Sequence, residues 1–371
     1  MKKPIDYAKE AVEMMMKKYS AGDLPPKGHF HYHQGVFLSG VYKTYILCKN
    51  ENYFDYIKSW VDAMLDEDGN IINHEPGQLD DIQPGILLYP LIDRCSELGT
   101  KEAQKDKKKY QHAIDSLIKI FDTYPRTDDG GLWHRAWTTG QLWLDGLYMG
   151  GPIMAEYGQR YDRKDLTETV AKHVKSICKH TYDEKTGLLR HAYDETKNEE
   201  WADSETGLSP EIWGRSVGWV PVAILDDLDF IKEDTLQANE LRTIVTDLLT
   251  ALLDYQGEDG MWYQVIDKNK ADGNWPETSC TCLFTAAICK ALKKNIISEN
   301  KEEFMNAAKK AYEAVIKTLS YDENGNVQIG GVCIGTGVGD YEYYINRPTS
   351  VNDLHGVGAF LLMCSEMEQL S

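Results

Sequence analysis

The feature that most constrains how this chain folds is an acidic turn with glycine, which recurs five times and is each time followed by a short apolar or aromatic stretch. Asp-Gly and Asn-Gly pairs favour turns because glycine adopts positive φ without a steric penalty. The turns lie about one helical hairpin apart, and such spacing is typical of a repeat architecture. The copies are DEDGNII (66–72), TDDGGLW (127–133), DEKTGLL (183–189), GEDGMWY (257–263) and DENGNVQI (322–329), with turn glycines Gly69, Gly130, Gly187, Gly260 and Gly325.

Between these turns the apolar residues recur with a helical period, which predicts twelve helices in six hairpins. The HFHYHQG segment (29–35) supplies a sixth connection, equivalent to the five turns. Six antiparallel hairpins can close into a double ring, an all-α (α/α)6 barrel with short β-hairpin-like loops at one mouth. The helices are expected at about 4–19, 36–49, 52–65, 85–98, 103–123, 141–157, 165–180, 213–232, 237–255, 279–294, 302–319 and 352–368.

An open helical solenoid is the alternative, but some predicted helices are apolar on more than one side. GILLYPLI (85–92) and CLFTAAIC (282–289) are examples, and a helix that is buried all round suits an inner ring. We identify no linker rich in Pro, Gly or Ser, so one barrel domain is expected over residues 1–371.

The charge balance excludes several classes of partner. A net charge of −19 argues against nucleic-acid binding and against adsorption to anionic membranes. An acidic substrate would need a local cluster of Arg, Lys or His. The charged N-terminal segment does not resemble a signal peptide, and no apolar run is long enough to span a membrane. We therefore expect a cytoplasmic protein, a monomer or weak homo-oligomer, whose eight scattered cysteines are reduced core thiols.

Aromatic and histidine side chains gather beside the turns. Several of the nine Trp residues flank turns near carboxylates, His and Arg, which favours carbohydrate binding over simple core packing. In HFHYHQG, His29, His31 and His33 alternate, so an extended segment would present them on one face. Zinc would need a third or fourth ligand, and no HExxH-type helix supplies one. Hydrogen bonds to sugar hydroxyls or to the loop backbone are therefore expected, and no metal.

Two acidic motifs are candidates for catalysis. Asp80 and Asp81 precede a predicted helix, so one of them could cap it while the other faces a pocket. Asp145 lies among Trp143, Leu144 and apolar neighbours near the start of another helix. An unpaired ionised carboxylate is costly there, so it must act as a cap, form a pair or stay protonated, and a protonated Asp suits an acid catalyst.

Basic side chains near the other motifs could bind an acidic substrate. Arg215 lies between Trp213 and Trp219 in SPEIWGRSVGWV (209–220), where its guanidinium fork could match a carboxylate. A buried pair with Glu211 or another acid is the alternative. His191 follows a turn strand, and His355 in NDLHGVG (352–358) opens the last predicted helix and could serve to close the barrel.

Taken together, these motifs resemble those of the unsaturated rhamnogalacturonyl hydrolases, family 105 of the glycoside hydrolases. The resemblance runs in order over nearly the whole chain and is carried by HYHQGVFLSGV (31–41), LDDIQPG (79–85), WLDGLYMGGP (143–152), SPEIWGRSVGW (209–219) and NDLHGVGAF (352–360). It implies an (α/α)6 barrel and a small acidic disaccharide or oligosaccharide substrate that ends in a 4,5-unsaturated galacturonyl unit. It also implies hydration of the C4=C5 double bond, with no attack at the anomeric carbon, and no cofactor or metal.

The same resemblance assigns roles to residues. Asp145 is implied as general acid and base, and Asp80 as a supporting carboxylate that raises the pKa of Asp145. Three alternatives stay open: an unsaturated glucuronyl hydrolase acting on glycosaminoglycan fragments, a His-based sugar epimerase on the same type of barrel, and a non-catalytic sugar-binding barrel. The implied substrate contacts are Tyr32, His134, Arg135, Trp143, His191, Trp213, Arg215 and Trp219.

Overall fold

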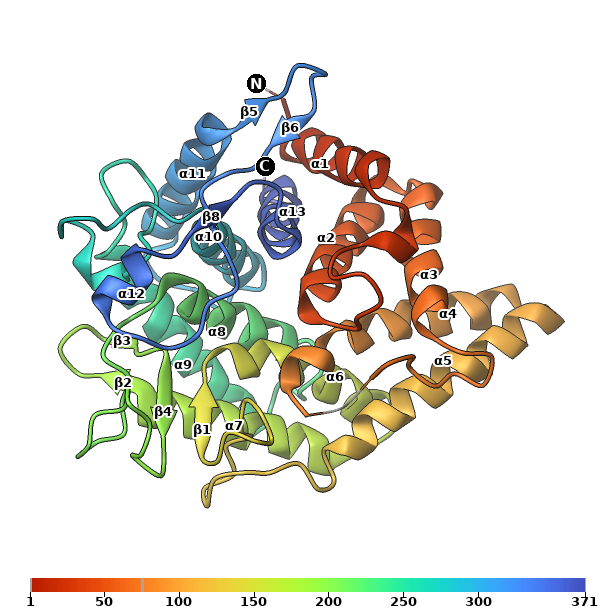
Figure 1. The fold of residues 1–371 in the computed structure, drawn as a ribbon, viewed down its shortest axis with the longest axis horizontal. Helices are drawn as coiled ribbons and strands as arrows, with labels where there is room; N and C mark the ends of the chain where they lie inside the picture. The colour runs from red at the N-terminus through yellow and green to blue at the C-terminus, as the bar shows by residue number, and fades with distance from the viewer. Residues whose placement is uncertain (1, 75–76, 371) are drawn as a thin grey trace.

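The computed structural model of the protein describes residues 2–74 and 77–370 and is an (α/α)6 barrel, as predicted (Figure 1). Six helices form the inner ring and six form the outer ring. The inner helices are α2 (Tyr32–Cys48), α4 (Leu88–Leu98), α6 (Asp145–Arg160), α8 (Gly214–Asp227), α10 (Thr278–Lys293) and α13 (Leu354–Glu368). The outer helices are α1 (Pro4–Lys18), α3 (Glu51–Met64), α5 (Lys101–Ile120), α7 (Lys164–Thr181), α9 (Leu236–Leu253) and α11 (Lys301–Thr318).

Some segments depart from the predicted elements. The chain before α4 forms two short 3-10 helices, η2 (Leu79–Asp81) and η3 (Gln83–Leu87). Residues 141–143 form strand β1 (Gln141–Trp143) and not a first helical turn, because their backbone pairs antiparallel with β4 (Ala192–Asp194). A five-residue helix, α12 (Tyr341–Ile345), lies in a segment for which no helix was expected.

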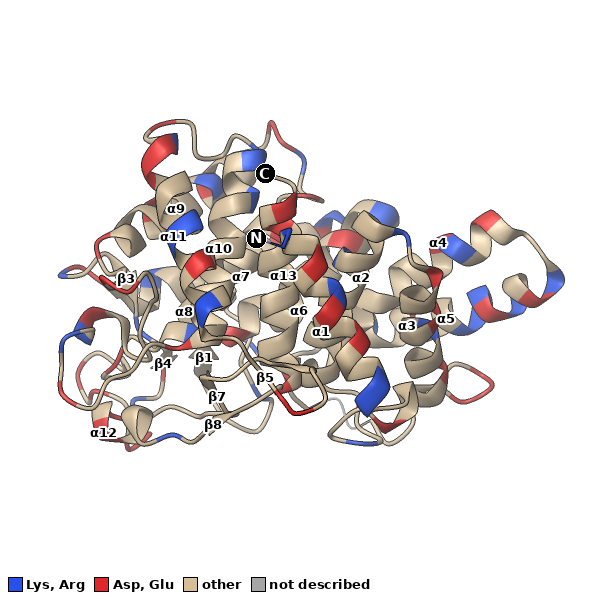
Figure 2. Ribbon diagram, turned by 90° about the horizontal axis from the view of Figure 1, so that it is seen from above, with Lys and Arg blue, Asp and Glu red and all other residues tan. Residues whose placement is uncertain are grey.

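The five predicted turns are confirmed. Each turn glycine has positive φ, from +71° at Gly187 to +97° at Gly130. Each turn follows an outer helix and leads toward the next inner one, so the loops gather on one side of the barrel (Figure 2). Two turns close antiparallel pairs, β2 (Tyr182–Asp183) with β3 (Leu188–Leu189) and β5 (Ser320–Tyr321) with β6 (Val327–Gln328). A further pair joins β7 (Val332–Cys333) to β8 (Thr349–Ser350).

The ring closes where the last inner helix, α13, packs along the first, α2 (Figure 1). Their backbones approach closely, since a Cβ added at Gly358 would lie 2.6 Å from the carbonyl oxygen of Val36. The inner helix α10 is buried on all sides, as expected, since every residue from Thr278 to Leu292 is buried. In contrast, α4 exposes its last three residues, Ser96 to Leu98. Segments more than 300 residues apart are therefore held together at this seam.

The last two features of the fold concern the cysteines and the apolar character of the helices. All eight cysteines carry free thiols, and seven of them are buried. Among the described helices, none is both long enough and apolar enough to cross a membrane.

Candidate active site

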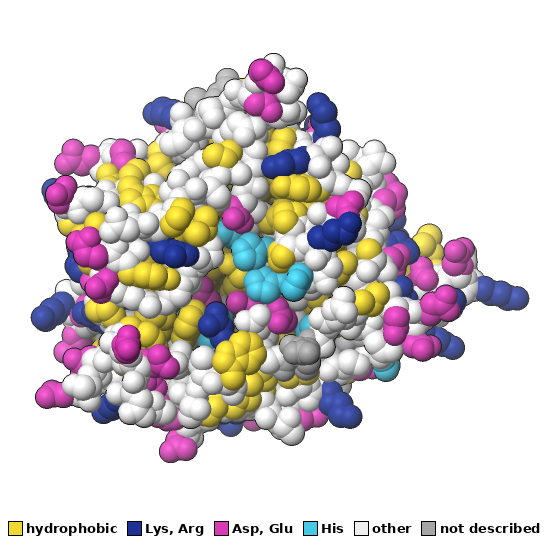
Figure 3. All heavy atoms as spheres, viewed as in Figure 1, with side chains coloured by type: hydrophobic (Ala, Val, Ile, Leu, Met, Phe, Trp, Pro, Cys, Tyr) yellow, Lys and Arg dark blue, Asp and Glu magenta, His cyan; other side chains and the backbone are white. Residues whose placement is uncertain are grey.

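The loop-bearing mouth of the barrel holds a cavity of about 300 Å³ (Figure 3). It lies at the N-terminal ends of inner helices such as α2, α6 and α8, where the helix dipole leaves partial positive charge. An anionic ligand is therefore favoured locally in spite of the net charge of −19. The lining residues are His31, Tyr32, His33, Gln78, Asp80, His134, Arg135, Trp143, Asp145, Met149, Trp213, Arg215, Gly335, Thr336 and Gly337.

Backbone pairing between two loops brings Asp80 to this cavity. Gln78 forms an antiparallel bridge with Arg135, and the N–H of Leu79 donates to the carbonyl of His134 at 3.1 Å. Asp80 then follows in η2, with its carboxylate 3.7 Å from Nε2 of His134. Its neighbour Asp81 turns away and accepts a hydrogen bond from the Gln78 side chain at 2.9 Å, so Asp80 is the member of the pair that faces the cavity.

Asp145 is the first residue of α6 and is held by a buried histidine. The N–H of Leu144 donates to the carbonyl of His191, and Nε2 of His191 lies 3.1 Å from Oδ2 of Asp145. Nδ1 of the same ring lies 2.6 Å from the hydroxyl of Tyr344, which itself accepts from the N–H of Gly339. The Tyr344 hydroxyl therefore donates to Nδ1, and the ring N–H on Nε2 is directed at Asp145.

The two carboxyls have opposite pKa shifts. For Asp80, burial first and the charge of Asp145 second raise the pKa from 3.8 to about 8. For Asp145, burial raises the pKa, but the hydrogen bond from His191 and nearby positive charge outweigh it and bring the pKa below its ordinary value. At neutral pH the proton is therefore on Asp80 and the negative charge on Asp145. The sequence predicted the reverse, a protonated Asp145 beside an anionic Asp80, because it does not reveal that His191 donates to Asp145.

Arg135 and its aromatic neighbours form one wall. The guanidinium of Arg135 lies 4.8 Å from the centre of the Trp143 ring, and that ring stacks on His134 at 4.6 Å. Burial lowers the pKa of His134 to about 3, so its imidazole is neutral. Arg135 thus supplies a positive charge near Asp80, which partly offsets the rise in the pKa of that carboxyl.

The guanidinium of Arg215 was expected to be free to bind a substrate carboxylate, but it already has other partners. It is buried and donates to the carbonyl of Cys333 at 2.6 Å and to the carbonyl of Ile334 at 2.8 Å, while its guanidinium packs on Trp213. The alternative partner Glu211 instead pairs with Lys268. Arg215 therefore holds the loop that supplies Gly335 to Gly337, and it gives the cavity positive charge.

Eight of the ten predicted site residues line the cavity, and the other two do not. His191 is fully buried behind Asp145 and orients that carboxylate. Trp219 lies one turn beyond Arg215 on α8, 1% exposed, and stacks on Tyr148 at 4.8 Å. The expected sugar contact for Trp219 is wrong in this arrangement, since its indole is used in packing between α6 and α8. The extended arrangement predicted for the histidines is also incorrect past His31, because His33 lies in the first turn of α2.

Several residues of the site were not singled out in the sequence. Met149 follows Asp145 by one helical turn and could have been found from that spacing. The rim segment 335–337 belongs to a glycine-rich stretch, which hinted at a close backbone approach. No local sequence pattern around Tyr344 indicated its contact with His191, because the two residues are 153 positions apart in the sequence.

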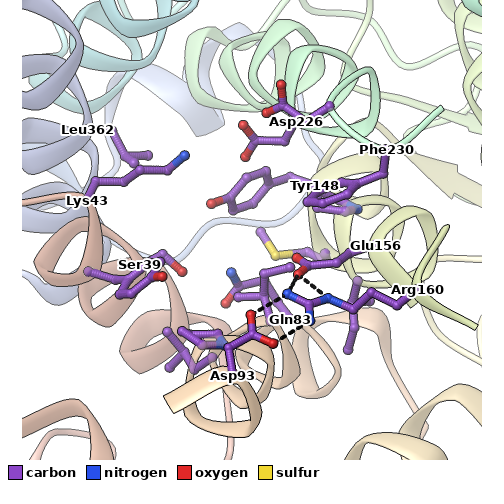
Figure 4. A pocket seen from close by; sticks show the side chains of 18 residues that line it. Ser39, Lys43, Gln83, Asp93, Tyr148, Glu156, Arg160, Asp226, Phe230 and Leu362 are labelled. Atoms are coloured by element: carbon purple, nitrogen blue, oxygen red, sulfur yellow. Dashed lines mark hydrogen bonds and ion pairs between the residues drawn. The ribbon is translucent and has the colours of Figure 1, made fainter. Parts of the chain in front are cut away.

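A second cavity, of about 320 Å³, lies further along the inner helices toward their C-terminal ends (Figure 4). Its charged walls are largely self-paired: Arg160 binds Asp93 through two contacts of 2.7 Å and also contacts Glu156. Met149 lines both cavities and lies between them. None of the predicted site residues is among the described residues around this second cavity, so the cavity at the mouth is the candidate active site.

Comparison with known proteins agrees with this arrangement. The model of Glycosyl Hydrolase Family 88 matches residues 7–371. A solved glycoside hydrolase of family 105 from C. acetobutylicum is 31% identical, with a TM-score of 0.89 over 98% of this chain and 99% of that one. The unsaturated rhamnogalacturonyl hydrolase YesR of Bacillus subtilis is 26% identical over 63% of each chain. An unsaturated glucuronyl hydrolase from Bacillus sp. GL1, responsible for the degradation of glycosaminoglycan, shares the fold at 15% identity, with a TM-score of 0.68 over 97% of this chain and 94% of that one.

The match over almost the whole length and the closeness of the solved structure agree with the motifs and with the barrel. The chain belongs to Glycosyl Hydrolase Family 88 as this family model defines it, together with the glycoside hydrolases of family 105 that its motifs resemble.

Proposed function

We propose that this glycoside hydrolase is an unsaturated rhamnogalacturonyl hydrolase, which removes an unsaturated galacturonyl unit from rhamnose at the non-reducing end of a short oligosaccharide. The observation that carries the proposal is one cavity faced by two carboxyls of opposite pKa shift, Asp80 and Asp145. A pair that divides proton and charge in this way suits a reaction that needs both an acid and a base. The likeness to YesR supports the same substrate class.

The chemistry follows from the protonation of the pair. The neutral carboxyl of Asp80 donates its proton to C4, while the carboxylate of Asp145 takes a proton from the water whose oxygen adds to C5. The product is a hemiketal at C5, which opens to a ketone, and the resulting hemiacetal at C1 releases the rhamnose-ended alcohol. At the end Asp80 is ionised, because its proton stays on C4, and Asp145 carries the proton from the water. Proton exchange with solvent then restores the starting pair. One water is consumed, and no bond to the anomeric carbon is attacked directly.

The substrate's carboxylate is bound by positive charge at the mouth. Arg135 lines the cavity, whereas the guanidinium of Arg215 already donates to two backbone carbonyls. We therefore assign the carboxylate contact to Arg135, with the helix N-termini adding to the favourable potential. Apart from these two arginines, the described lining residues include no Lys or Arg. This supports an uncharged second sugar such as rhamnose over a sulfated aminosugar.

The test follows the ultraviolet absorbance of the conjugated double bond of unsaturated galacturonyl-rhamnose, with Asp145→Asn and Asp80→Asn in parallel. The proposal expects absorbance to fall and rhamnose to appear with the wild-type protein, and both variants to lose at least a thousandfold in rate. His180→Ala, outside the cavity, is the matched control and should keep full activity. Thermal unfolding of each variant shows that lost activity is not lost folding.

The outcomes separate the alternatives. Turnover of an unsaturated glucuronyl-aminosugar but not of the rhamnose substrate would replace the proposed activity with that of a glucuronyl hydrolase. If the wild-type protein leaves the absorbance unchanged but epimerises a sugar, and Asp145→Asn keeps that epimerase activity, a His-based epimerase would be favoured instead. A variant Asp80→Asn with wild-type rate would remove Asp80 as the acid.

A further inference from the structure

Three side chains of metal-ligand type meet where the first and last inner helices begin. Within the described residues, His33, Asp353 and His355 each offer one ligand atom, and these atoms all lie within 4.8 Å of one another. We propose that they form a binding site for a divalent transition-metal ion of the class that takes two imidazole nitrogens and one carboxylate oxygen. The proposal concerns a different set of side chains from the catalytic pair and does not depend on the proposed function.

The orientation of His355 is the first argument. Its Nε2 lies 3.1 Å from the carbonyl oxygen of Cys333, and because a carbonyl only accepts, Nε2 carries the proton. In the neutral ring, Nδ1 then keeps its lone pair. A histidine whose other nitrogen donates to a backbone carbonyl is the arrangement that orients metal-binding imidazoles in proteins.

The contact between His355 and Asp353 is the second argument. Nδ1 of His355 lies 2.7 Å from Oδ1 of Asp353, yet this fully buried nitrogen has no hydrogen-bond partner in a suitable direction among the described residues. A simple ion pair would align the ring N–H with the carboxylate. A cation placed between the nitrogen and the oxygen could be bound by both atoms at once.

The third ligand, His33, is oriented by its own neighbour. Nδ1 of His33 lies 3.0 Å from Nδ1 of His31, and Nε2 of His31 faces Oδ1 of Asp81 at 3.9 Å. If the proton of His31 is on the side of Asp81, its Nδ1 accepts from His33, and Nε2 of His33 is left with a lone pair. All three ligand atoms would then be available without any rearrangement of the backbone.

The nearby charges and the number of ligands determine how tightly this site would bind an ion. Asp353 supplies a negative charge, but Arg215 donates to the same carbonyl of Cys333 that accepts from His355, so a positive charge lies close by. Three ligands and this repulsion predict weaker binding than at a closed four-ligand zinc site. Because His33 also lines the mouth cavity, open coordination positions on the ion would face that cavity. The ion would tie the start of α2 to the start of α13 and reinforce the seam of the ring.

The experiment measures metal binding by the full-length protein after treatment with a chelator and dialysis. Co²⁺ is titrated while the visible absorption of the bound ion is recorded, and Zn²⁺ is titrated by calorimetry. We expect one ion per chain, displacement of Co²⁺ by Zn²⁺, and a higher melting temperature with Zn²⁺ present, since an ion that binds only the folded state stabilises it.

Two variants and one control assign the ion to these residues. His33→Ala removes one imidazole, and Asp353→Asn removes the charge while Asn still caps α13. Each should weaken binding at least tenfold and abolish the rise in melting temperature. His180→Ala is the matched control, since His180 pairs with Asp129 at 2.8 Å outside this cluster, and it should bind like the wild type. Absence of saturable binding in the wild type, or equal binding by the wild type and a folded Asp353→Asn, would overturn the proposal.

Discussion

Replacing Asp80 with Asn should make the folded protein more stable at alkaline pH while it removes activity. Burial and the neighbouring charge raise the pKa of Asp80 from 3.8 to about 8, so between these values the folded protein holds a proton that the unfolded chain has lost. For an acid with a raised pKa in the folded state, stability is greatest below the unfolded pKa and is lost as pH rises through the folded one. The neutral amide of Asn avoids this loss, so the gain from the substitution is absent near pH 4 and complete above pH 8.

The size of the gain can be bounded from the structure. Each factor of ten in acidity is worth about 1.36 kcal/mol, so a rise from 3.8 to about 8 corresponds to an upper limit of roughly 6 kcal/mol. The Asp80 side chain is 12% exposed and faces an open cavity, where water lowers the cost of its charge. We therefore expect a gain of about 1–3 kcal/mol, which for a chain of 371 residues shifts the melting temperature by about 1–4 °C.

Differential scanning calorimetry at one scan rate, from pH 4.5 to 9, measures the effect. Asp128→Asn, at an exposed loop carboxyl, is the matched control and should show no gain that grows with pH. Asp145→Asn should act in the opposite direction at neutral pH, because the pKa of Asp145 is lowered and its charge is stabilised by His191. An Asp80→Asn variant that is less stable than the wild type at pH 8.5, or whose advantage does not change with pH, would refute the reasoning.

Three further predictions follow from the same structure. Tyr344→Phe leaves Nδ1 of His191 without its buried donor, so kcat should fall about tenfold with little change in KM, and an unchanged kcat would show that the hydroxyl does not orient the ring. In the wild type, kcat/KM should decline as pH rises past about 8, when Asp80 loses its proton; a profile that is flat to pH 9.5 would contradict its role as acid. Gly358→Ala places a Cβ 2.6 Å from the carbonyl oxygen of Val36, so denaturant unfolding should show a loss of about 1–3 kcal/mol, and a neutral result would mean that the α2–α13 seam can separate slightly.

Much of the fold followed from local patterns. Helical periodicity located the twelve helices of the two rings but not the short α12. The acidic turns located five of the glycines with positive φ, because turns and helical periods both depend on residues that are neighbours in the chain. Local patterns failed where a distant segment competes. Residues 141–143 pair as a strand with 192–194, and Trp219 is taken up by packing against Tyr148 on another helix.

The sequence by itself determined the barrel, the family and the placement of most candidate residues near one mouth. The spacing and order of the motifs can be read without knowing which residues are in contact. Only the tertiary structure decided how protons and charges are distributed among those residues. The proton is on Asp80 because burial and the charge of Asp145 raise the pKa of Asp80. The negative charge is on Asp145 because His191, oriented by Tyr344 from the far end of the chain, donates to it. In the sequence His33 had no further candidate ligand nearby, and the closing of the ring brings Asp353 and His355 to it. Protonation and ligand geometry depend on burial and on contacts between segments hundreds of residues apart, which no local pattern encodes.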